Sequence, residues 1–305
     1  MVDALRQRYA GEHLSISLPS LRLDSFSVEL ADSLQGSRRS GLTFAPEAAT
    51  PAMRRLINKP IPDEDLLAVA QAVFQRGWPT VKLYFMIGLP QETLDDVQAI
   101  VSLVQRVLAV GRAAIGGRAK VHVGVSTFVP KPHTPFQWAG LDEEANIRQK
   151  QALLRQALRS KAIRLTWNDP RESLLEAVLS RGDRRVGKAV LEAWRLGARF
   201  DAWQEHFRAE LWEAAFQRAG LDPAFYAYRM RDVDEVLPWD HIDVGVRRAY
   251  LWREWQQALA GQVSPDCRAG CLGCGINIAL EPLAEGANWL CPAVGVAASA
   301  RQVAP

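Results

Sequence analysis

Three of the four cysteines form a C-x3-C-x2-C run made of Cys267, Cys271 and Cys274. Thiolates at this close spacing can bind zinc or an iron–sulfur cluster. No cysteine precedes Cys267, whereas a disulfide framework spreads its cysteines through a short secreted chain. The sequence therefore predicts a metal or cluster site near the carboxyl end of the chain, with Cys291, His241 or water as the fourth ligand.

A second group of candidate residues is tied to a series of predicted β-strands. Alternating or continuous apolar runs predict strands at residues 14–18, 41–45, 80–87 and 121–129. At or just after the ends of these strands lie the candidate ligand-binding residues Arg22, Glu47, Gly88 and Ser126. The chain contains no P-loop, nucleophile elbow or HExxH motif, so the sequence gives no support to a kinase or hydrolase.

Amphipathic helices are predicted between these strands. Their ranges are residues 28–34 and 51–57, a helix that begins at Asp63, and one from Asp95 or Asp96 to Leu108. Strands that alternate with helices form parallel βα units, hence a sheet or barrel of the α/β class. Both architectures place their ligand sites at the carboxyl ends of the strands, where the candidate residues lie.

The pattern changes after Gly140. Long helices are predicted at residues 143–161, 201–219 and 244–259, joined by turns. We therefore expect three regions: an α/β region at residues 1–140, a helical domain at residues 141–262, and a cysteine-containing tail at residues 263–305.

Composition narrows the class of protein. The chain has 305 residues, of which 48% are hydrophobic and 23% charged, and its formal net charge is +3. These values are typical of a globular protein with a buried core, and they do not by themselves demand a nucleic-acid partner. Neither a membrane-spanning run nor a secretion signal is evident in the sequence, so we expect a cytoplasmic protein.

Several long motifs add a family resemblance. The segments LTFAPEAATPAMRRLINK, VKLYFMIGLPQET and VSTFVPKPHTPFQW resemble the later part of a radical S-adenosylmethionine (radical SAM) core. The likeness is strongest to the uncharacterised cobalamin-binding-type radical SAM proteins. It implies the later strands of an incomplete (β/α)6 barrel, followed by a mainly helical region.

The resemblance also implies cofactors. S-adenosylmethionine would lie across the carboxyl ends of the strands and chelate one iron of a 4Fe–4S cluster, giving a 5′-deoxyadenosyl radical. By position, Gly88 and Ser126 would lie near the adenosine, and Glu47 and Arg22 near the ribose or the methionine end. Cobalamin is implied only for a full-length relative.

The family's own C-x3-C-x2-C cluster loop follows the first barrel strand, and this chain has no cysteine there. We therefore expect the cluster ligands on a missing amino-terminal segment, from a truncated or split protein. Because Cys267, Cys271 and Cys274 follow every predicted strand, an auxiliary metal or cluster is favoured there over the radical-generating cluster or a metal-free role.

The sequence leaves two functions open. The first is radical chemistry on an unknown substrate, with RNA modification as one possibility. The alternative is a degenerate, non-catalytic barrel that binds RNA or a partner protein.

Overall fold

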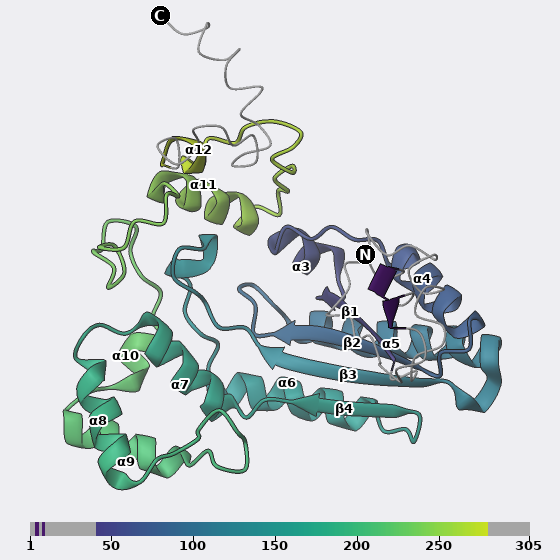
Figure 1. Cartoon of the computed structure of the whole chain (residues 1–305), viewed down its shortest axis with the longest axis horizontal. Helices are drawn as coiled ribbons and strands as arrows, with labels where there is room; N and C mark the ends of the chain where they lie inside the picture. Colours follow the sequence, from purple (N-terminus) through teal and green to yellow (C-terminus); the bar gives the residue numbers. More distant parts are fainter. Residues whose placement is uncertain (1–3, 6–7, 10–40, 280–305) are drawn as a thin grey trace, which may run out of the picture. The chain divides into compact units, whose positions relative to one another are not determined.

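The computed structural model describes residues 4–5, 8–9 and 41–279 (Figure 1). The predicted strand at 14–18, the predicted helix at 28–34, Arg22 and Cys291 lie outside the described residues. The chain divides into two compact units, the first formed by residues 1–128 and 145–168, and the second by residues 129–144 and 169–305. Residues 145–168, which the sequence placed in the helical region, thus belong to the same unit as the sheet.

The first unit contains a four-stranded parallel sheet in the order β1-β2-β3-β4. Its strands are β1 (Leu42–Glu47), β2 (Thr80–Ile87), β3 (Lys120–Thr127) and β4 (Ile163–Trp167). The intervening helices are α3 (Pro51–Leu56), α4 (Asp63–Gln75), α5 (Leu94–Ile115) and α6 (Glu144–Ala157), with a 3-10 turn η2 (Gly116–Arg118) before β3. Each new strand is added on the same side of the last. Right-handed crossovers in one direction therefore place α4, α5 and α6 on one face of the sheet, where their apolar side chains share a core with the strands.

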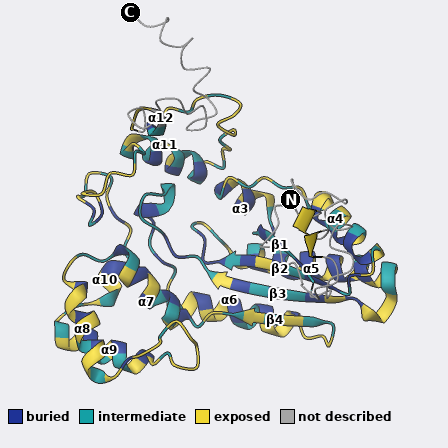
Figure 2. Ribbon diagram, viewed as in Figure 1, coloured by how far each residue is buried: buried dark blue, intermediate teal, exposed yellow. Residues whose placement is uncertain are grey.

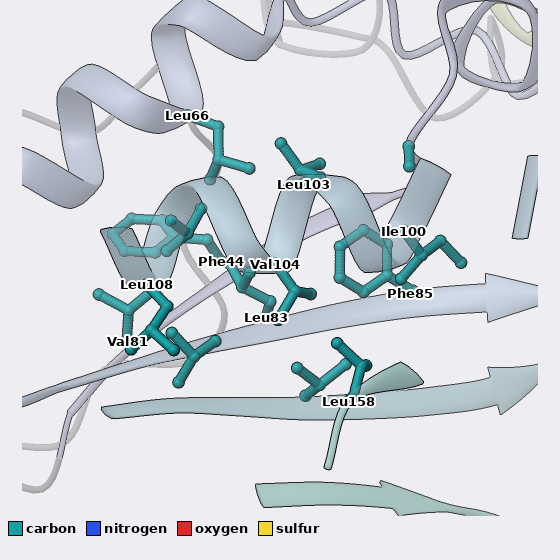
Figure 3. Packing of buried hydrophobic residues seen from close by; sticks show 14 of the residues in the cluster. Phe44, Leu66, Val81, Leu83, Phe85, Ile100, Leu103, Val104, Leu108 and Leu158 are labelled. Atoms are coloured by element: carbon teal, nitrogen blue, oxygen red, sulfur yellow. The ribbon is translucent and has the colours of Figure 1, made fainter. Parts of the chain in front are cut away.

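That helical face contains the core of the first unit. Val81, Leu83, Phe85 and Ile87 alternate along β2 and are buried, as expected for side chains that point to the same side of a strand. Figure 3 shows the side chains of α5 packed against this row. Polar or partly exposed residues occupy the alternate positions of the strands, so the opposite face of the sheet is polar.

The strand β4 corrects the sequence analysis, which predicted only helices after Gly140. Ile163, Leu165 and Trp167 are partly buried against the core, whereas Arg164 and Thr166 are exposed. This alternation is the strand signal that was missed. The strand pairs with β3 from Val121↔Ile163 onward, and this pairing fixes it in the sheet.

The helix α5 is long and apolar. Its first turn is fixed by a capping box between Thr93 and Asp96, so the helix begins at Leu94, one residue before the first predicted start. The segment Leu94–Arg118 is long and apolar enough to cross a membrane, with 39% of its most apolar window buried. Its buried side packs on the sheet, so the core explains its apolar character. A cytoplasmic location remains a prediction.

The second unit is helical. It contains η3 (Pro135–Trp138), α7 (Pro170–Arg181), α8 (Val186–Leu196), α9 (Ala209–Ala219), α10 (Pro223–Ala227), α11 (Arg248–Leu259) and α12 (Ile276–Ala279). Along α8 and α9, buried and exposed residues alternate (Figure 2). The predicted helix at 201–219 was too long, because residues 201–206 form turns and Phe200 has a φ of 58°. The predicted helix at 244–259 begins only at Arg248.

Candidate functional site

The carboxyl edge of the sheet brings three of the predicted residues together. Glu47 ends β1, Gly88 directly follows β2, and Ser126 is the second-last residue of β3. Glu47 is in register with Phe85, and Ser126 with Met86, so the three residues lie at neighbouring positions of one edge. Their role in binding a cofactor stays a prediction.

The end of β1 is held by an ion pair. Glu47 has a φ of 64°, a left-handed conformation that is uncommon for a residue with a side chain. The Nζ of Lys59 lies 3.3 Å from Oε1 of Glu47 and also donates to the carbonyl of Ala45. Both side chains are about a quarter exposed, so the Glu47 carboxylate can still accept a hydrogen bond from a ligand hydroxyl or amine.

The end of β2 is fixed by a buried charge pair. The backbone N–H of Gly88 donates to Oε2 of Glu92 at 2.7 Å, and Nζ of Lys150 on α6 lies 2.7 Å from the same oxygen. The side chains of Glu92 and Lys150 are only 3% and 8% exposed. Gly88 has a φ of 83°, which favours glycine. Since its N–H is already used, Gly88 can meet a ligand only through its Cα and carbonyl.

A second carboxylate links the loops after β1 and β2. Asp96 accepts a hydrogen bond at 2.6 Å from the hydroxyl of Thr50, the N-cap of α3, and others from Thr93, the N-cap of α5. Burial raises the pKa of Asp96, but these hydrogen bonds and the charge of Lys150 outweigh it and hold the pKa below its ordinary value of 3.8. Asp96 therefore stays ionised and rigidly oriented at neutral pH.

The end of β3 contributes two hydroxyl groups. Ser126 is exposed, and its Oγ donates weakly to the carbonyl of Phe85 at 3.4 Å. Thr127 Oγ1 is buried and has no hydrogen-bond partner among the described residues. A buried hydroxyl without a partner is costly, so a ligand at this edge that supplied one would be stabilised.

The polar face of the sheet carries cations that the sequence analysis largely missed. Lys82, His122 and Arg164 lie in register on three adjacent strands. The sequence did contain a signal for them: in a strand every second residue points to the same face, and these residues occupy the polar positions of their strands.

The three cysteines of the second unit do not form a metal site in this structure. Cys267 and Cys271 are exposed and Cys274 is partly exposed, and all three are free thiols. Within residues 41–279, no group of three or more His, Cys, Asp or Glu side chains is arranged to hold a metal ion. The chemistry of three thiolates fits zinc or an iron–sulfur cluster, and the auxiliary site remains a prediction.

His133 lies in the second unit. It has a φ of 56°, and its Nε2 is buried without a hydrogen-bond partner among the described residues. It lines a cavity of about 170 Å³ together with Gln137, Asp240, Asp243 and Arg248. Arg248 donates to Asp240 at 2.5 Å and to two backbone carbonyls, so this wall is already internally paired.

The fold is that of an α/β protein with a parallel sheet, and such folds place their ligand sites at the carboxyl ends of the strands. Residues 1–104, which include β1 and β2, match the Radical SAM superfamily. The chain is also similar to an uncharacterized protein of Methanocaldococcus jannaschii, with 32% identity over 178 residues. The aligned part is 58% of this chain and 37% of that relative, so the chain spans well under half of the relative's length.

Residues 1–104 thus match the radical SAM superfamily, as the sequence motifs predicted. The narrower resemblance to the cobalamin-binding-type proteins remains a prediction. Proteins of this superfamily generally bind S-adenosylmethionine and a 4Fe–4S cluster. The first unit does not fit the cluster, because no cysteine precedes Cys267 in the sequence.

Proposed function

We propose that the first unit supplies the S-adenosylmethionine-binding and substrate-facing part of a radical SAM enzyme. The observation that carries this proposal is the placement of Glu47, Gly88 and Ser126 on one carboxyl edge, within a chain of this superfamily. In such enzymes the bound cofactors supply a 5′-deoxyadenosyl radical that abstracts hydrogen from the substrate.

The sheet also supports a specific architecture, the later part of an incomplete (β/α)6 barrel. Its four strands are parallel and follow one another in sequential order. One face is covered by helices and the other is polar, as expected for an arc whose polar face would line a barrel interior. A doubly wound sheet would instead reverse its strand order at a switch point.

Within this site the chain's own residues have distinct roles. Glu47, oriented by Lys59, accepts hydrogen bonds from the ribose hydroxyls or the amino group of S-adenosylmethionine. Ser126 and Thr127 offer hydroxyls to its adenosine portion. Glu92, Lys150 and Asp96 act as positioning residues, because they are bonded to the loops after β1 and β2 rather than free to bind a ligand.

The cluster ligands must come from elsewhere. Since the sequence before Cys267 has no thiol, we propose that cysteines from a separate amino-terminal radical SAM segment complete the site. Expression with such a segment is expected to give an active assembly that this chain does not form alone.

The direct test is ligand binding by calorimetry with S-adenosylhomocysteine, which lacks the reactive sulfonium. The Glu47→Gln variant is expected to bind at least about tenfold more weakly than the wild type, since it loses a charged hydrogen-bond acceptor. Glu176→Gln, which changes an exposed carboxylate of the second unit, is the matched control and should bind normally. Equal binding by both variants would contradict the proposed site.

A second assay concerns the cluster. After anaerobic incubation with iron and sulfide, followed by reduction, this chain alone is expected to form no 5′-deoxyadenosine from S-adenosylmethionine. Product formation by the chain alone would overturn the separate cluster segment. Salt-dependent binding of bulk RNA without any binding of S-adenosylhomocysteine would favour the alternative, a non-catalytic binding module.

A further inference from the structure

A row of cations crosses the polar face of the sheet in the first unit. Lys82 on β2, His122 on β3 and Arg164 on β4 are register partners. Neighbouring strands lie about 5 Å apart, so the three residues span about 10 Å. Lys82 and His122 are partly exposed and Arg164 is exposed, which leaves their charged groups accessible to a ligand.

The residues around His122 show that this surface is positively charged. The charges that act on it come from Arg164, Lys82 and Lys120, and all are positive. Among residues 41–279, no carboxylate forms an ion pair with Lys82, His122 or Arg164. Lys82 and Arg164 are like charges on either side of His122, so an anion that bridges them would be favoured, and His122 can donate a hydrogen bond to it. Burial, and then the neighbouring cations, lower the pKa of His122 below its ordinary value of 6.5.

An aromatic ring lies on the same face, two residues further along the strand from this row. Tyr84 is 47% exposed, and its register partner is Gly124. A Cβ atom at Gly124 would lie only 2.6 Å from Cε1 of the tyrosine, so the absence of a side chain lets the ring lie against β3. The ring is about 7 Å from the cation row, given the rise per residue of a strand.

We propose that this face binds a nucleoside monophosphate, with its phosphate on Lys82, His122 and Arg164 and its base stacked on Tyr84. Lysine and arginine are the usual phosphate ligands, and bases stack on exposed aromatic rings. The distance between the row and the ring suits the separation of base and phosphate in a nucleotide. S-adenosylmethionine is a poor match, because it has no phosphate and carries a sulfonium cation.

The position of the row also separates the two ligands. Lys82 lies five residues before Ile87, so the row is roughly 15 Å from the carboxyl edge. A nucleotide anchored there would end at Tyr84, short of Ser126, which lies four residues along β3 from His122. We infer that the bound nucleotide is the substrate, and this part of the inference rests on the proposed function. Nucleotide binding itself does not depend on the proposed function.

The test is calorimetry with uridine 5′-monophosphate, which lacks the adenine of S-adenosylmethionine. Uridine and inorganic phosphate are the partial ligands. Lys82→Met and Arg164→Met are each expected to weaken binding of the monophosphate at least about tenfold. Tyr84→Leu should weaken binding of the monophosphate but not of phosphate. Lys188→Met, an exposed lysine on α8, is the matched control and should change neither affinity.

Several outcomes would overturn the proposal. They are absence of binding at millimolar nucleotide, equal binding by Lys82→Met and the wild type, and tight binding of single-stranded RNA without binding of the monophosphate.

The same titrations distinguish this proposal from the proposed function. If uridine 5′-monophosphate binds and S-adenosylhomocysteine does not, the nucleotide site is supported. The proposed S-adenosylmethionine site at the carboxyl edge is then contradicted. If only S-adenosylhomocysteine binds, the reverse holds. Saturation with one ligand should leave the site of the other accessible.

Discussion

The pair formed by Glu92 and Lys150 offers the sharpest test of how the carboxyl edge is held. Lys150→Met removes the ammonium and leaves the Glu92 carboxylate, only 3% exposed, without its cation. Glu92→Gln removes the negative charge but keeps an oxygen that can accept the hydrogen bond from Gly88. The double variant removes both charges from the interior.

The expected size of the effect follows from burial. Loss of one partner of a buried ion pair costs about 3–5 kcal/mol, because the remaining charge stays desolvated and loses the opposite charge beside it. We therefore expect Lys150→Met to lower the free energy of unfolding by about 3–5 kcal/mol. Glu92→Gln should cost less, since the glutamine oxygen can still accept the hydrogen bond from the N–H of Gly88. The double variant should be less destabilised than Lys150→Met alone.

The assay is urea denaturation of the four proteins, arranged as a double-mutant cycle. Lys131 and Glu176 form a matched control pair, with side chains 43% and 56% exposed, and their coupling should be below about 1 kcal/mol. A coupling between Glu92 and Lys150 as small as that of the surface pair would refute the reasoning. It would mean that water reaches this pair and that the edge is not rigidly held.

Four further predictions concern the fold and the cysteines. Gly88→Ala should lower the free energy of unfolding by about 1–2 kcal/mol, because its φ of 83° is unfavourable for a residue with a Cβ atom. Thermal unfolding measures this loss. An unchanged melting temperature would contradict the left-handed conformation of Gly88. Leu83→Ala, at a fully buried position, should cost about 2–5 kcal/mol in urea, and a loss below 1 kcal/mol would contradict close packing. Asp96→Asn should have a lower free energy of unfolding than the wild type at pH 7. This difference should shrink as the pH falls through the depressed pKa of Asp96, below 3.8. A difference that does not change with pH would contradict the charged network. Zinc or iron bound after anaerobic loading should be lost in Cys271→Ser, and retention of metal by this variant would argue against the thiolate site.

The pattern of residues determined much of the fold in advance. Three strands and the helices between them were predicted from apolar periodicity, because a buried strand or helix face must be apolar wherever it packs. The motifs after the strands also led to the radical SAM superfamily, which the comparisons support. The predicted edge residues Glu47, Gly88 and Ser126 follow from one rule, that parallel strands end on the same side.

The sequence could not identify the partners of these residues. Glu92 and Lys150 are far apart in the chain, and only the return of α6 to the sheet unit joins them as a buried pair. The row of Lys82, His122 and Arg164 likewise depends on the register between strands, including β4, a strand that was missed. Local periodicity predicts which side of a strand is polar. Which polar side chains become neighbours is determined by the pairing of segments that are distant in the sequence. For this reason the elements could be predicted from the sequence, whereas the charge pair and the cation row required the tertiary structure.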